Sequence, residues 1–237
     1  MNMESGKPEL AVERSEMVHP NYPQFTAPRP LPTSAGSLPV GAIATTLTTF
    51  SMSLMEWRGV TITNVYIANF FFLAAFGLFV SAQWELTAGN GFAYSVYGAF
   101  GLFFAGYGAI LTPSFGVVAA YGDDTKQLDN ALGFFLIIWS IFVLAYLVAS
   151  LPTDVVHILI FVFLELTFVL VAASYFAAAD GHTSTSVSLK KSGGVFAFLT
   201  GLVTWYLTFA LLLKDSLVEL PLGDTSKYFP KTRKKVE

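Results

Sequence analysis

The chain alternates long apolar runs with short polar connections. A helix that crosses a membrane needs about 20 mostly apolar residues to span about 30 Å of hydrocarbon, and six runs come near or above that length. Polar or helix-breaking residues end the runs, for example Arg58 after the first and Pro152 after the fourth. The runs are Leu38–Met55, Val60–Ala82, Gly91–Ala120, Ala131–Leu151, Val155–Ala179 and Gly193–Leu213. This pattern predicts an all-α membrane protein, folded as a bundle of six transmembrane helices.

Two of these runs depart from the simple pattern. The run Gly91–Ala120 is longer than one crossing and contains Thr112 and Pro113, where the missing N–H of proline predicts a kink or a helix end. The run Leu38–Met55 contains four threonines and two serines, which lower its hydropathy. Lipid offers these hydroxyl groups no partners, so they favour a position that faces the interior of the bundle.

Polar tails flank the predicted bundle. Residues 1–37 are rich in proline and polar side chains and predict a disordered N-terminal tail, residues 38–214 hold the six-helix membrane transport domain, and residues 215–237 form a C-terminal tail with a basic end. Six crossings place both tails on one side of the membrane. That side carries nine of the lysines and arginines and the other side four, so the positive-inside rule predicts cytoplasmic termini.

The composition supports lipid exposure and argues against other classes of protein. Hydrophobic residues make up 54% of the chain and charged residues 12%, against roughly 25% charged residues in soluble domains. No basic face with interleaved aromatic residues is visible, which argues against nucleic-acid binding. The chain has no cysteine, no P-loop and no metalloprotease or serine-hydrolase motif. We therefore expect no enzyme activity, no cofactor and no metal site.

Small residues recur at a spacing of four in three of the runs. This spacing places each set on one face of a helix, where small side chains let neighbouring backbones approach closely. Tight packing within the bundle explains all three stripes, and the hydroxyl groups of the first would in addition line a polar path. The stripes are Gly41, Thr45, Thr49 and Ser53; Gly101, Ala105 and Ala109; and Gly193, Ala197 and Gly201.

Three titratable residues stand in or beside the apolar runs. Glu165 is a carboxylate well inside a run, and intramembrane charged groups usually face the bundle interior or a cavity. It would either relay a proton coupled to transport or fix helix contacts as a hydrogen-bonded carboxyl. Asp154 and His157 lie one turn apart at the start of the fifth run. They form either a pH-sensing pair or, as we favour, an interfacial helix cap.

Four short motifs occur in an order that is characteristic of a known family. A Gly-Asn-Gly-Phe motif at residues 89–92 precedes Tyr-Gly-Ala-Phe at 97–100, with Leu-Thr-Thr-Phe upstream at 47–50 and Leu-Pro-Leu-Gly-Asp downstream at 220–224. With these motifs, about residues 36–224 resemble the acetate uptake transporter family. These are the YaaH-type permeases, which include bacterial succinate–acetate permeases and fungal acetate permeases.

This resemblance implies a function and a set of pathway residues. It implies a homohexamer in a fungal-type plasma membrane, with one pathway through each protomer for acetate and related short-chain carboxylates together with protons. Tyr97 and Leu166 match two positions of a hydrophobic constriction in the pathway, and Thr45 stands where the family usually has Phe. Further candidates for the pathway or for proton coupling are Thr48, Thr49, Glu85, Asn90 and Glu165.

The start of the first helix departs from the family signature. Where the family has Asn-Pro-Ala-Pro-Leu-Gly-Leu, this chain keeps only Pro39 and Gly41 in place. The change removes an amide that could cap the helix or contact a carboxylate, and Thr45 in place of Phe would widen and wet the constriction. The leading hypothesis is a proton-coupled carboxylate transporter. The alternatives are a passive channel for acetic acid or ammonia, and a non-transporting membrane sensor or scaffold of the same fold.

Overall fold

A computed structural model describes residues 36–214, 216 and 218–230 of the chain. In this part of the chain, six α-helices account for most of the residues and no strand is present, which confirms the predicted fold class. A π-helical segment, Asn69–Phe76, leads directly into the second α-helix, so that one continuous span runs over Asn64–Thr87. The helices are α1 Ser37–Leu54, α2 Gly77–Thr87, α3 Gly91–Leu111, α4 Thr125–Ser150, α5 Val155–Ala179 and α6 Thr183–Leu213.

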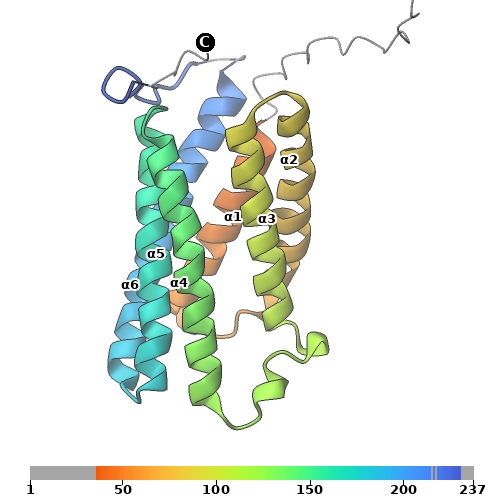
Figure 1. Cartoon of the computed structure of the whole chain (residues 1–237), viewed down its shortest axis with the longest axis vertical. Helices are drawn as coiled ribbons and strands as arrows, with labels where there is room; N and C mark the ends of the chain where they lie inside the picture. The colour runs from red at the N-terminus through yellow and green to blue at the C-terminus, as the bar shows by residue number, and fades with distance from the viewer. Residues whose placement is uncertain (1–35, 215, 217, 231–237) are drawn as a thin grey trace, which may run out of the picture.

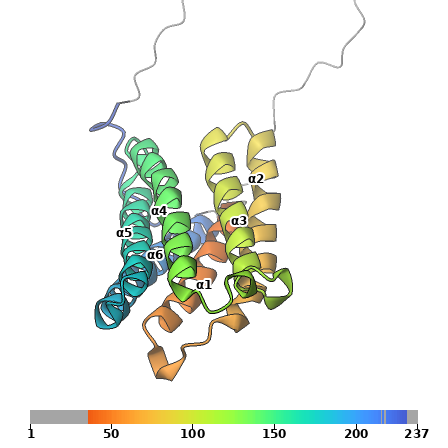
Figure 2. The same ribbon diagram turned by 60° about the horizontal axis from the view of Figure 1, so that its bottom comes forward.

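The helices run along the long axis of the molecule as an elongated bundle (Figure 1). Turned towards its lower end, the molecule shows two groups, with α2 and α3 on one side and α4, α5 and α6 on the other (Figure 2). Helix α1 lies between the groups, where it packs mainly against α6 and also contacts α2. The start of α1 and the end of α6 lie at the same end of the bundle, as an even number of crossings requires (Figure 1).

Five of the spans are long and apolar enough to cross a membrane, and the hydroxyl-rich α1 is not among them. The predicted break in the third run is confirmed, because α3 ends at Leu111, immediately before Thr112 and Pro113. Helix α5 has the predicted bounds. The six-helix prediction therefore holds, and the composition of α1 sets it apart from the other five helices.

The sequence predicted the presence of each helix more accurately than the residue at which it begins. Helix α6 begins at Thr183 rather than at Gly193, and α4 begins at Thr125 rather than at Ala131. Apolar runs mark the part of a helix inside lipid, whereas a helix extends into water wherever a cap supports its first turn. At α4 this cap is Asp124, whose carboxylate accepts the backbone N–H of Gln127 at 3.0 Å.

The second span differs from its prediction at both ends. The predicted run began at Val60, but residues 60–63 are not helical and the span begins at Asn64. At its other end the helix continues past Ala82 to Thr87 and then turns at Gly89, which has a φ of +78°. That left-handed conformation favours glycine. The extension carries Glu85 to the start of α3.

Helices α1 and α6 approach closely at glycines. A Cβ added to Gly201 would lie 3.1 Å from the backbone nitrogen of Thr48, and one added to Gly194 would lie 3.3 Å from that of Met55. At the other end of the contact, Gly41 of α1 faces Thr208 of α6. On α3, Gly101 similarly faces the backbone of the π-helical segment before α2, at Ala75. The glycines of these three stripes therefore serve helix packing, as the sequence indicated.

The chain after α6 folds back onto the start of α5. The sequence predicted a C-terminal tail from residue 215, and residues 221–225 of it are seated on the bundle by hydrogen bonds. The N–H of Val155 donates to the carbonyl of Gly223 at 2.9 Å, and the buried Thr225 hydroxyl donates to the carbonyl of Leu151 at 2.7 Å. The Tyr206 hydroxyl of α6 donates to the carbonyl of Pro221 at 2.7 Å.

Candidate functional site

A cavity of about 420 Å³ lies between the helices of the bundle. Helices α1, α3, α5 and α6 supply most of its wall, together with the turn between α2 and α3. The cavity begins at the bundle end where α1, α3 and α5 start, and we call this end the mouth. Leu222, from the segment that folds back after α6, forms part of the wall there. The described lining contains no lysine or arginine.

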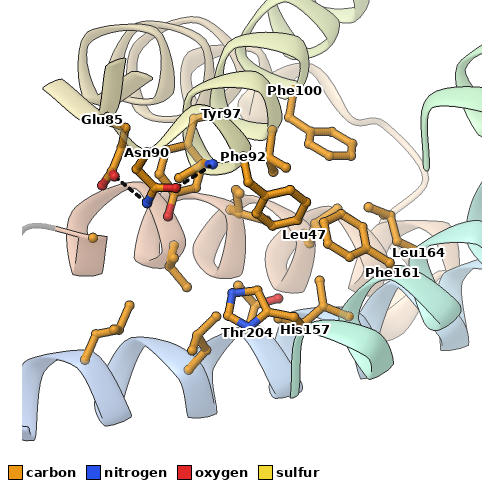
Figure 3. Close-up of a pocket in the computed structure, with 18 of the residues that line it drawn as sticks. Leu47, Glu85, Asn90, Phe92, Tyr97, Phe100, His157, Phe161, Leu164 and Thr204 are labelled. Carbon is orange, nitrogen blue, oxygen red and sulfur yellow. Dashed lines mark hydrogen bonds between the residues drawn. The ribbon is translucent and has the colours of Figure 1, made fainter. Parts of the chain in front are cut away.

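One wall of the mouth carries a hydrogen-bonded pair, Glu85 and Asn90. The Asn90 amide nitrogen donates to Glu85 Oε2 at 2.8 Å, while Asn90 Oδ1 accepts the backbone N–H of Ala93 at 3.3 Å and so caps α3 (Figure 3). The backbone N–H of Asn90 also donates to the Glu85 carbonyl at 2.9 Å. Tyr97 lies beside this pair, about two helix turns into α3. The hydrogen bonds fix Glu85 and Asn90, and Tyr97 adds a third polar side chain to the same wall.

The other wall of the mouth carries His157, next to Thr204 of α6 (Figure 3). Both carboxylate oxygens of Asp154 lie close to His157 Nδ1, at 2.8 and 2.9 Å. The same carboxylate accepts the backbone N–H of His157 at 2.9 Å and so caps α5. The predicted helix cap is therefore confirmed. The two side chains form an ion pair whenever the imidazole is protonated.

Beyond the mouth the cavity becomes apolar and narrows. A second cavity, of about 50 Å³, lies deeper in the bundle and is lined by Tyr107 and Thr167 among others. Rings pack tightly between the two spaces, and the centroids of Phe103 and Phe168 are 5.0 Å apart. Five side chains line both cavities, and we call them the apolar barrier. They are Leu47, Phe103, Phe104, Leu164 and Phe168.

The structure brings together three of the residues expected on a pathway. Glu85, Asn90 and Tyr97 all line the cavity. Leu166, expected at a constriction, lies outside the lining with 38% of its surface exposed, whereas Leu164 lies in the apolar barrier. The two leucines point in different directions because each residue of an α-helix is rotated by about 100° from the one before.

The expected hydroxyl groups of α1 are engaged within their own helix. The Thr45, Thr48 and Thr49 hydroxyls donate to carbonyls one turn earlier, at 2.8, 2.7 and 2.8 Å. None of the three lines either cavity. Back-bonding of this kind is the usual alternative for a threonine inside a membrane helix. Of the signature remnant, Pro39 is buried in the first turn of α1, and Gly41 faces α6 as described above.

Glu165 also lies away from both cavities, beside Ser140 of α4. Its Oε2 atom is buried and has no hydrogen-bond partner among the described residues. Its role in proton coupling stays a prediction.

Sequence reasoning missed most of the apolar lining. Phe100, Phe103, Phe104 and Phe168 line the cavity but were not among the candidates. A signal was present on α3, because Phe100 and Phe104 follow Tyr97 at spacings of three and seven, which places all three on one face. His157 was assigned a capping role, and its position in the cavity wall depends on the packing of α5 against α6.

The similarity of the chain to known proteins identifies its family. The sequence model of the GPR1/FUN34/yaaH family matches residues 19–223 of this chain. The chain belongs to this family. The resemblance stated from the motifs is therefore confirmed, and the chain is an integral membrane protein of a family of transporters and channels.

Two fungal relatives in the family are both named acetate transporter protein patA. The protein of Aspergillus clavatus is 46% identical over 217 residues, which cover 91% of this chain and 86% of the relative. The protein of Penicillium expansum is 47% identical over 203 residues, which cover 85% of this chain and 82% of the relative.

A solved structure shares the fold. It is described as the bacterial acetate channel SatP, and it matches with a TM-score of 0.69 at 20% identity, over 80% of this chain and 98% of that chain. At this identity the match shows the architecture of the bundle alone.

Proposed function

We propose that this protein transports acetate and related short-chain monocarboxylates, coupled to protons, along a pathway inside each protomer. The observation that carries the proposal is the cavity between α1, α3, α5 and α6, with its polar mouth and its apolar barrier. Its volume of about 420 Å³ accommodates an acetate with its first waters, and its position along the bundle axis suits a solute that crosses the membrane. The names of the patA relatives support acetate as the substrate.

The chemistry of the pathway favours transport with a proton. A carboxylate that leaves water for an apolar medium pays a large desolvation cost unless it is paired or neutralised. The described lining provides no lysine or arginine, and the apolar barrier provides no polar side chain. A neutral acid, or an anion accompanied by a proton, avoids most of this cost.

The assembly and location that we propose follow the same family. The exposed outer faces of the spans are apolar, and at most 44% of the best window in any of them is buried within one protomer. Lipid or neighbouring copies must cover the rest. We propose a symporter that forms a homohexamer in the plasma membrane, with both termini cytoplasmic.

The proposal is tested with the purified full-length protein in proteoliposomes. Labelled acetate is supplied outside, with and without an inward proton gradient, and accumulation is compared with that in empty liposomes. Accumulation above the outside concentration, abolished by a protonophore, is the expected result. If acetate only equilibrates across the membrane and the protonophore has no effect, the protein is a passive channel rather than a symporter. If acetate, acetic acid and ammonia all fail to cross, a sensor or scaffold is favoured.

A further inference from the structure

His157 is the one side chain in the described lining of the cavity that can carry a positive charge. We propose that the His157 imidazole, held by Asp154, binds the carboxyl group of the transported acid and accepts its proton at Nε2. This inference rests on the proposed function and assigns the recognition step to a residue that the motif comparison did not select.

The contacts of Asp154 fix the orientation of the ring. Its two carboxylate oxygens lie 2.8 and 2.9 Å from His157 Nδ1, and its bond to the backbone N–H of His157 anchors it to the first turn of α5. A carboxylate acceptor at Nδ1 selects the tautomer that carries its proton there. The other ring nitrogen, Nε2, then has a free lone pair. About a third of the side chain is accessible, and the residue belongs to the cavity wall (Figure 3).

The charges around the mouth explain why an acid needs such a group. Asp154 lies beside the ring, Asp224 is paired with Asp154 through the backbone of the returning segment, and Glu85 and Tyr97 lie on the opposite wall. Helices α1 and α6 contribute apolar side chains and the Thr204 hydroxyl to the lining. Without a cation at His157, the carboxylates of the mouth would repel an acetate that forms there from the entering acid. Protonation of His157 offsets one negative charge where acetate would bind.

The proton transfer is balanced within the complex. The acid enters as the neutral species, and the proton leaves its carboxyl oxygen and bonds to Nε2. The products are a carboxylate and an imidazolium that also donates to Asp154 through Nδ1. The new anion therefore lies against a cation whose other side is already paired. Return of the proton to the carboxylate regenerates the neutral acid, which can cross the apolar barrier.

The first test measures the acetate KM of the full-length protein in proteoliposomes with the His157→Gln substitution. Glutamine keeps a donor but cannot hold a second proton. Because the substitution removes a hydrogen bond between two charged groups, we expect the KM for acetate to rise about tenfold or more. Inhibition by acetamide, a neutral molecule of the same shape, is expected to stay unchanged. His182→Gln is the matched control, because His182 lies at the start of α6, outside the cavity lining.

A second measurement leaves His157 itself unchanged. The chain contains three histidines, so replacing His19 and His182 by Gln leaves His157 as the single histidine that diethyl pyrocarbonate can modify. We expect acetate to slow its modification and acetamide to have no effect. Asp154→Asn keeps a capping oxygen but removes the charge, and it is expected to weaken the protection by acetate.

The outcomes separate this inference from the proposed function. If the wild-type protein transports acetate while His157→Gln has an unchanged KM, or if acetate gives His157 no protection, His157 is not the recognition group and the transport proposal stands. If the wild-type protein moves no acetate at all, the proposed function itself fails.

Discussion

At the scale of single residues, two helix caps hold the polar groups of the cavity in place. Asn90 caps α3 with one atom and donates to Glu85 with another, and Asp154 caps α5 while it contacts the His157 ring. Each capping side chain therefore serves the helix and the mouth at once. A substitution there changes both, so its effect on transport has to be read beside its effect on stability.

Asn90→Ala is expected to lower both the stability and the rate of acetate uptake. The change removes the cap of α3, which is worth about 1 kcal/mol, and leaves Glu85 without its amide donor. Thermal unfolding in detergent and uptake in proteoliposomes measure the two effects. Asn130→Ala is the control, because among the described residues the Asn130 amide bonds only to the carbonyl of Lys126, on the exposed first turn of α4. Equal unfolding temperatures for the two variants would contradict the capping role.

Leu164→Ala is expected to relax the size selectivity of the pathway. Shortening a side chain of the apolar barrier makes room for extra methylene groups, each of which is worth about tenfold or more in a fitted apolar pocket. The ratio of butyrate uptake to acetate uptake should therefore rise by about that factor. Leu166→Ala is the matched control, since Leu166 faces away from the cavity in the protomer. A larger change in the Leu166 variant would place the constriction where the motif comparison put it.

The sequence identified some of these residues and not others for a geometric reason. Glu85, Asn90 and Tyr97 stand in or near a motif at a helix start, where local chain geometry brings neighbours in sequence together. Leu164 and Leu166 stand in the middle of a mostly apolar helix, on either side of Glu165. Apolar side chains lie on every face of the helix there, so the packing of α5 against its neighbours decides which leucine points inward.

At the scale of the helices, hydrophobic runs predict that a helix exists better than they predict where it begins and ends. The run that became α6 was predicted from Gly193, but ten further residues, including Lys190 and Lys191, extend the helix beyond the apolar part. An ion pair from Lys191 to Glu56, with N and O 2.7 Å apart, ties this extension to the turn after α1. Both side chains are partly exposed, so the pair adds little stability and chiefly indicates where the extension lies.

Gly201→Ala is expected to disrupt the contact of α1 with α6. The added methyl group would lie 3.1 Å from the Thr48 backbone nitrogen, and backbone cannot move aside as a side chain does. Overpacking of this kind costs about 1–3 kcal/mol, which should lower the unfolding temperature in detergent. Gly106→Ala is the control, because nothing lies within 4 Å of its added methyl group within the protomer. A Gly201 variant as stable as the control would show that the helices can separate without loss.

At the scale of the whole molecule, the ends of the bundle differ in what they contain. The mouth, the start of α1 and the segment that returns after α6 share one end, and the turn after α3 lies at the other (Figure 1). Because the described bundle has an even number of crossings, both of its ends lie on the same side of the membrane. Locating one loop on one side of the membrane therefore fixes the orientation of every helix. The positive-inside count predicts that the mouth faces the cytoplasm.

Single cysteines test this orientation directly, since the chain has none of its own. Ser114→Cys places a thiol on the exposed turn after α3, and Ser226→Cys places one in the returning segment. In intact cells, a membrane-impermeant maleimide is expected to label residue 114 and to spare residue 226. Permeabilised cells provide the control, because both thiols should then react. The reverse pattern in intact cells would invert the proposed topology.

The close contact between α1 and α6 also sets the order in which the bundle can be completed during synthesis. Helix α1 leaves the ribosome first, but its main partner is made last, whereas α2 with α3 and α4 with α5 are neighbours both in the chain and in the bundle. Helix α1 therefore lies in the membrane without its main packing partner for most of translation. During that time its threonine hydroxyls keep hydrogen-bond partners, because Thr45, Thr48 and Thr49 donate to carbonyls of their own helix. These three hydroxyl groups are thus satisfied before the partner of α1 exists.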